Sequence, residues 1–173
     1  LSWCYYDPEM APLIEIAQTR GSYEYEGCPT GLVTAGDCGR VAGHFIQDGL
    51  NRGMRFGIVA GGDHRGRNLT GVFAPELERD AIFRNLRAKR TYGTSGQRAF
   101  LDVRVNDHFM GEEFALDADE PRTITVRAQG TAPVTQVDLF RNGRIVDHRG
   151  GRRKAVNLEL VDDEPLLERE NYY

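Results

Sequence analysis

The sequence has 173 residues, of which 40% are hydrophobic and 28% charged, and its net charge is −4. This length and composition predict a soluble globular protein with one ordinary domain or two small ones. The net charge gives no general attraction to nucleic acid, and no apolar run approaches the ~20 residues that a membrane helix needs. The sequence therefore predicts neither a nucleic-acid partner nor a membrane span.

The first half of the chain alternates short apolar strands with helical patterns. Residues 12–18 (PLIEIAQ) and 54–60 (MRFGIVA) predict two buried strands, and residues 37–53 and 74–90 carry apolar side chains at helical spacing. Strand, helix, strand and helix in this order predict an α/β unit with parallel strands. The apolar face of the second helix is expected to pack against the sheet through Leu77, Ile82, Phe83 and Leu86.

The second half has the period-two pattern of a β module. Residues 99–105 alternate, with apolar side chains on one face, and similar strands are expected at residues 123–129 and 155–161. Asn142-Gly143 predicts a two-residue hairpin turn, whose buried side would include Val137, Leu139 and Ile145. We therefore predict two domains, residues 1–97 and residues 98–173, the second one β-sandwich-like.

One strand of the first half ends in a group of ionisable residues. Within residues 58–67 (IVAGGDHRGR), Gly61 and Gly62 permit close approach of the backbone, and Asp63 and His64 are metal-ligand types. Ligands of α/β proteins bind beyond the carboxyl ends of the strands, which favours a site here. The alternative is that Asp63 caps a turn and that His64 is a surface histidine.

Other polar residues leave alternatives open. Glu15 is a lone acid in an apolar strand, so it needs either a polar site or an ion-pair partner. The three cysteines include no C-x-x-C pair, so Cys28 and Cys38 either form a bridge or remain thiols. Basic residues 141–154 and acidic residues 162–170 predict two solvated faces, with a polyanion site as the alternative.

Long stretches of the chain resemble a known family. Residues 48–114 and the upstream residues 5–29 are similar to a bacterial family of unknown function in the PHP (polymerase and histidinol phosphatase) superfamily. Its most specific parts are residues 81–96 (AIFRNLRAKRTYGTSG) and the strand-end Asp-His element. Residues 137–146 (VDLFRNGRIV) are similar to the β module of that family.

The resemblance implies a metal-dependent phosphoesterase. PHP proteins are distorted α/β barrels in which histidines and carboxylates hold up to three divalent ions (Zn, Mn or Fe), and residues 1–97 would be the closing part of such a barrel. A metal-bound hydroxide would attack a phosphoester. By resemblance, His64 is a metal ligand and Glu15 lies on the inner side of the barrel, and Asp63 beside His64 is the second candidate ligand. From their position in RTYGTSG, we expect Arg90, Tyr92 and Thr94 to reach a substrate anion. The alternative is that they are a helix C-terminal cation and packed turn residues.

Two departures from the PHP pattern weaken the predicted metal site. The acid of the family's Asp-x-His motif falls on Gly62, and Asp63 and His64 would point to opposite sides of an extended backbone. The early His-x-His motif is absent, because the histidines are isolated at positions 44, 64, 108 and 148. We therefore expect weak or no metal binding by this chain alone.

These observations lead to two alternative functions. The first is a fragment or divergent member of a metal-dependent phosphoesterase-like hydrolase family, inactive as this chain alone, with a small phosphoester or another anion as substrate. The alternative is a non-catalytic binding or assembly module that uses the β-rich half. A start at Leu1 and an abrupt end in ENYY lead us to expect a piece of a longer protein, with the rest of that protein or a second copy as partner. The expected compartment is a bacterial cytoplasm or periplasm.

Overall fold

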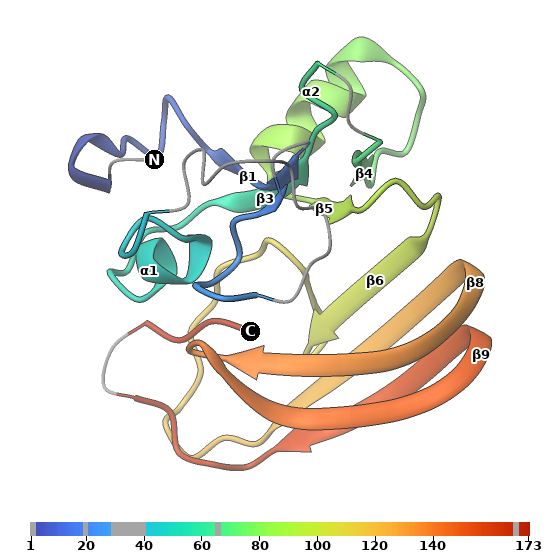
Figure 1. The fold of residues 1–173 in the computed structure, drawn as a ribbon. Coiled ribbons are helices and arrows are strands. Elements are labelled where there is room, and N and C mark those ends of the chain that lie inside the picture. Colours follow the sequence, from blue (N-terminus) through green and yellow to red (C-terminus); the bar gives the residue numbers. More distant parts are fainter. Residues whose placement is uncertain (1–2, 19–20, 29–40, 65–66, 168–169) are drawn as a thin grey trace. The chain divides into compact units, whose positions relative to one another are not determined.

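A computed structural model describes residues 3–18, 21–28, 41–64, 67–167 and 170–173. The chain divides into two compact units, Leu1–Gln97 and Arg98–Tyr173. The first unit, coloured blue to green in Figure 1, contains η1 (Trp3–Tyr5), β1 (Leu13–Gln18), β2 (Gly21–Ser22), α1 (Ile46–Leu50), β3 (Gly57–Ala60), β4 (Leu69–Val72), α2 (Arg79–Arg87) and β5 (Thr91–Thr94). The second contains β6 (Phe100–Val105), β7 (His108–Phe109), β8 (Arg122–Arg141) and β9 (Arg144–Asp162).

The first unit has a three-stranded sheet in the order β2-β1-β3 and a separate β4-β5 pair. β1 and β3 are parallel, from Leu13 opposite Gly57 to Ala17 opposite Ala60, as the alternation of strand and helix predicted. The sheets do not close into a barrel, so the predicted closing part of a barrel is wrong. The sheet ends at β3 because, among the described residues, no further strand forms a backbone ladder with the outer edge of β3.

Threonine hydroxyls replace a neighbouring strand at the outer edge of β3. The Thr70 hydroxyl accepts a hydrogen bond from the Ala60 N–H (2.9 Å) and donates one to the Ala60 carbonyl (2.7 Å). The Thr91 hydroxyl donates to the Ile58 carbonyl (2.7 Å). The β4-β5 pair is therefore held beside β3 by side chains, and the polar groups of this edge are satisfied without a continuous ladder.

Thr70→Val is expected to destabilise the first unit by about 1–3 kcal/mol, because it leaves two part-buried backbone groups of Ala60 without their partner. Thr70→Ser keeps the hydroxyl and is the matched control. Denaturant unfolding followed by the fluorescence of Trp3, the single tryptophan, measures both variants. Equal stabilities of the valine and serine variants would contradict this role of the hydroxyl.

The core of the first unit is centred on Trp3, which stacks on Phe56 with ring centroids 5.6 Å apart. The predicted helix over residues 37–53 is much shorter, since α1 covers only Ile46–Leu50 and residues 37–40 lie outside the described residues. Gly43 has φ +80°, which a helix does not accommodate, and the Phe45 N–H donates to the Asp48 carboxylate and starts the helix at the next residue.

The expected packing of α2 is partly wrong. Leu77 lies before the helix and is 96% exposed, and Phe83 is 60% exposed. Ala81, at 2%, is the buried position, with Ile82 and Leu86 half-buried beside it. The nine-residue helix therefore buries a narrower stripe than its sequence pattern predicted.

The second unit is a β-rich module with strand order β7-β6-β8-β9. β8 and β9 form one long hairpin, and Figure 1 shows the two strands curving together. Its turn is Asn142-Gly143, with φ values of +51° and +77°, and Arg141 pairs with Arg144 across it. The predicted two-residue hairpin turn is confirmed.

The hairpin folds back over its own beginning. Five steps of β8, from Gln129 to Val134, face two steps of β9, and these extra residues mark the bend. Leu139, from the far end of β8, packs with Ile124 and Leu160 in one core. The predicted burial of Ile145 is wrong: the register shift after Leu139 places Ile145 on another face, where it is 54% exposed.

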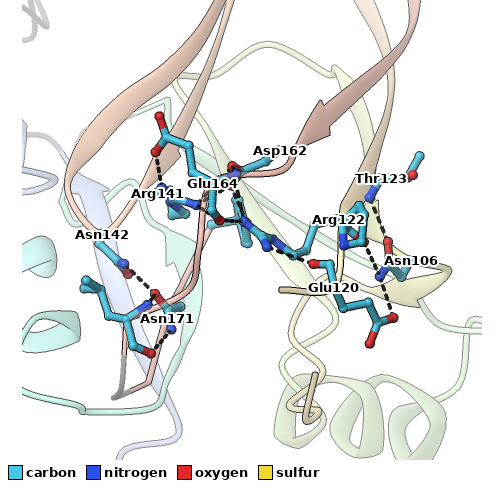
Figure 2. A network of polar contacts seen from close by, with 12 residues as sticks. Asn106, Glu120, Arg122, Thr123, Arg141, Asn142, Asp162, Glu164 and Asn171 are labelled. Atoms are coloured by element: carbon cyan, nitrogen blue, oxygen red, sulfur yellow. Dashed lines mark hydrogen bonds and ion pairs between the residues drawn. The ribbon is translucent and has the colours of Figure 1, made fainter. Parts of the chain in front are cut away.

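A group of four side chains, called the clasp here, joins the folded-back end of the hairpin to its beginning. Figure 2 labels three of them, Arg122, Arg141 and Asp162. The carboxylate of Asp162 accepts hydrogen bonds from Arg141 (2.8 Å) and from the Tyr173 hydroxyl (2.6 Å), and it lies 3.2 Å from the guanidinium of Arg122. The Arg122 side chain is fully buried. The clasp therefore links the start of β8, the end of β8, the end of β9 and the chain terminus.

Candidate functional site

The candidate site lies at the carboxyl end of the parallel β1-β3 pair. Glu15 projects from β1, and Asp63 and His64 follow β3. A Cβ atom on Gly61 would lie 2.3 Å from Oε1 of Glu15, so only glycine leaves room for this carboxylate. The close approach predicted at Gly61 is therefore the approach of the Glu15 side chain.

The electrostatics of the site follow from its two carboxylates. Burial, and secondly the charge of Asp63, raise the pKa of Glu15 above its ordinary value of 4.5. No cation pairs with Glu15 among the described residues, so the structural ion pair considered from the sequence is not seen there. The negative charges of Glu15 and Asp63 together favour positive charge in this region.

His64 meets Asp63 because the backbone turns between them. Asp63 has a positive φ of 47°, and the His64 Nε2 lies 3.3 Å from the Asp63 Oδ1. The opposite orientations expected of an extended backbone therefore do not apply. The His64 side chain is 84% exposed, whereas that of Asp63 is 25% exposed, so the imidazole lies on the solvent side of the pair.

A buried asparagine that the sequence analysis missed lies at the same end of β3. Thr70 is beside Ala60, and β4 runs antiparallel to β5, which follows the direction of β3. Asn68 therefore lies beyond the carboxyl end of β3. It is 6% exposed, and its amide nitrogen has no hydrogen-bond partner in the described part of the chain. The only sequence signal was a polar residue directly before an apolar strand.

Arg90 and Tyr92, which were predicted to bind substrate, lie at the start of β5 (Thr91–Thr94). Arg90 precedes β5, and because β5 follows the direction of β3, Arg90 lies toward the amino end of β3. Tyr92 crosses Gly71, where an added Cβ would lie 2.2 Å from the Tyr92 ring, and it neighbours Phe73. These positions place Tyr92 on the β4 side of β5.

The remaining histidines are dispersed. His44 is exposed before α1, His108 stacks on Phe114, and His148 lies 2.6 Å from the carboxylate of Asp138. Within the described ranges, no group of three or more histidine, cysteine, aspartate or glutamate side chains is placed to hold a metal ion. The described residues also contain no helix that is long and apolar enough to cross a membrane.

The cysteine alternatives stay open. Cys28 is buried, and its sulfur lies 3.8 Å from the carbonyl oxygen of Ser22. Cys38 lies outside the described residues, so a bridge between the two stays a prediction.

Comparisons with known proteins place the chain among uncharacterised proteins. The model of a family described as "Protein of unknown function (DUF3604)" matches residues 40–136, which is more than half of the chain. An uncharacterized protein of Chlamydia pneumoniae is 28% identical over 140 residues, 70% of this chain and 23% of the relative. One of Chlamydia trachomatis is 28% identical over 164 residues, 82% of this chain and 26% of the relative. No solved structure matches the chain.

The predicted membership of the PHP superfamily is wrong. The family model that matches is one of unknown function, the relatives are uncharacterised, and neither points to PHP proteins. Residues 48–114, the longest stretch that carried the resemblance, lie within the range that this family model matches. The chain spans about a quarter of the length of these two relatives.

Proposed function

This chain belongs to the DUF3604 family, and we propose that its Glu15 and Asp63 carboxylates form part of a metal-dependent hydrolytic site. One observation carries the proposal: the Glu15 carboxylate lies against Gly61, two residues before Asp63, and the charge of Asp63 adds to the effect of burial in raising the Glu15 pKa. A bound divalent cation offsets this repulsion, and carboxylate oxygens are the donors that hard cations prefer.

The chemistry of the donors fits a metal, but their number does not. Glu15, Asp63 and His64 offer oxygen and nitrogen ligands, yet the described residues contain no complete cluster. Further ligands would have to come from outside these residues. We therefore assign no reaction step to a metal, and we expect weak binding by this chain alone.

The proposed chemical role of Glu15 is proton transfer. A carboxyl group whose pKa is raised above its ordinary value accepts a proton from water more readily than an ordinary carboxylate does. The role of Asp63 is to help raise the pKa of Glu15 through its negative charge. The substrate class expected from the sequence, a phosphoester or another small anion, stays a prediction.

The experiment is titration of the metal-free chain with Mn²⁺ by isothermal calorimetry. We expect one weak site, with a dissociation constant of about 0.1–1 mM, as for sites with few charged ligands. Glu15→Gln and Asp63→Asn should each weaken it about tenfold or more, and His64→Ala should weaken it less because this side chain is exposed. Asp80→Asn, an exposed acid of α2, is the matched control.

A second measurement separates the carboxylate pair from metal binding. In Asp63→Asn, the pKa of the Glu15 carboxyl should fall, because the charge that raises it is removed. Carboxyl-carbon NMR during a pH titration follows this group. Unchanged Mn²⁺ binding in both carboxylate variants would overturn the proposed site, even if the pKa moves as expected.

A further inference from the structure

The outer edge of β9 pairs with no other strand in the part of the second unit that the structure describes. In the described residues β9 pairs only with β8, which Ala155–Asp162 contact through Arg122–Gln129. Residues 155–161 (AVNLELV) contain no proline, no glycine and a single charge. Prolines and charged side chains are features by which proteins block strand pairing at sheet edges, and this segment carries only the one charge.

The charges that flank this edge are complementary to those of a second copy of the edge that runs antiparallel to it. Residues 152–154 are Arg-Arg-Lys, and residues 162–164 are Asp-Asp-Glu, with Leu158 midway between them. If two β9 strands pair antiparallel about Leu158, each residue of the basic group lies opposite one of the acidic group. A two-fold axis generates such a self-complementary arrangement, because every contact then occurs twice.

Some of these charged side chains already form contacts within the chain, and the others are available for pairing with a second copy. Asp162 is occupied in the clasp, and Glu164 contacts Arg141. Arg153 and Asp163 are both exposed, and neither side chain forms an ion pair within the part of the chain that the structure describes. The extra residues of the bend lie in β8, so β9 continues without interruption from Arg153 into the edge.

The pairing register follows from the same charges. With Leu158 opposite itself, Arg153 lies opposite Asp163 at both ends of the ladder, and Asn157 lies opposite Glu159. Moving the register by two residues in either direction separates Arg153 from Asp163. In one direction it also brings Glu159 opposite Glu159. Like charges directly opposite each other on neighbouring strands are destabilising, so the centred register is favoured.

We propose that this chain forms a two-fold symmetric dimer in which the β9 edges of two copies pair antiparallel about Leu158, with Arg153 of each copy opposite Asp163 of the other. The partner is a second copy because the basic and acidic ends of one edge match each other. The backbone ladder supplies affinity, and the two ion pairs fix the register.

Charge reversal tests the proposal directly. Sedimentation equilibrium of the 173-residue chain should show a concentration-dependent dimer. Arg153→Asp and Asp163→Arg, each alone, place like charges at both ends of the ladder and should raise the dimer dissociation constant about tenfold or more. The double variant restores opposite charges and should return to within about threefold of the original. A mixture of the two single variants should form a heterodimer.

Two controls separate the charges of the edge from general effects of charge and of misfolding. Arg144→Asp makes the same charge change at an exposed position of β9 outside the edge, and it should leave dimerisation unchanged. Circular dichroism confirms that the surface variants remain folded. Hydrogen exchange of residues 155–161 should slow as the concentration rises. A chain that stays monomeric up to about 100 μM, or a dimer that the single reversals do not weaken, would overturn the proposal.

Discussion

Replacing Asp162 with asparagine is expected to lower the free energy of unfolding of residues 98–173 by about 3–5 kcal/mol at neutral pH. The substitution keeps the shape of the side chain but removes the negative charge facing Arg122, whose guanidinium is fully buried, and Arg141, which is 11% exposed. Removing one member of a buried ion pair leaves a buried charge that is not compensated. Arg122 retains the carbonyl oxygens of Glu120 and Glu164, which accept hydrogen bonds but carry no full charge.

Native-state hydrogen exchange of β6, β8 and β9 amides at increasing denaturant measures this loss within the unit. Asp119→Asn is the matched control, because it removes the same charge at an exposed position of the same unit. Its effect should stay within about 0.5 kcal/mol, as for most surface substitutions. A loss below about 1 kcal/mol in Asp162→Asn would mean that the clasp does not hold the hairpin.

The pH dependence of the same variant follows from the pKa of Asp162. Burial opposes ionisation of this carboxyl, but the hydrogen bonds from Tyr173, Arg122 and the Glu164 backbone, with the charge of Arg141, outweigh it and hold the pKa below its ordinary value of 3.8. A lowered pKa contributes stability that is present above the unfolded value and is lost as the pH falls through the folded value. The difference in stability between the original chain and Asp162→Asn should therefore narrow as the pH falls below 3.8.

Features that depend on neighbouring residues were predictable from the sequence. The turn at Asn142-Gly143 requires two positive φ angles, and its two residues tolerate them. The alternation in β6 predicted that Leu101, Val103 and Val105 face the core, and they do. The parallel strands on either side of α1 followed from the alternation of strand and helix.

Features that depend on register were not predictable in the same way. The fold-back of the hairpin arises from extra residues between Gln129 and Val134, and Ile145 left the core because of a later register shift. A slip of one residue moves a side chain to the other face of a strand. The clasp joins residues that are distant in sequence, and only the folded-back hairpin brings Arg122 and Arg141 to one carboxylate.

The candidate site also has parts that the sequence predicts and parts that depend on the packing of the strands. Asp63 and His64 could be predicted because ligand-binding residues gather at the carboxyl ends of strands. The position of Asn68 depends on the antiparallel course of β4, and that of Arg90 on the direction of β5. Both require the packing of the β4-β5 pair against β3, which rests on threonine hydroxyls and leaves no periodic signal in the sequence.

Ile124→Ala is expected to destabilise the second unit by about 2–5 kcal/mol, because the side chain is fully buried and its removal leaves a cavity. Ile145→Ala deletes the same atoms from a side chain that is 54% exposed, and it should cost less than about 1 kcal/mol. Hydrogen exchange of the β-strand amides measures both variants. Trp3 fluorescence reports separately on the first unit, which contains the only tryptophan.

The pattern of the response distinguishes a shared core from two separate layers. Ile124 packs in one cluster with Leu139, which comes from the folded-back part of β8. Ile124→Ala should therefore accelerate exchange near Leu139 as strongly as it does near Val126, on its own part of the strand. If only the amides near Val126 respond, the folded-back hairpin does not unfold cooperatively with the sheet beneath it. The contact between Leu139 and Ile124 would then contribute little to the stability of the unit.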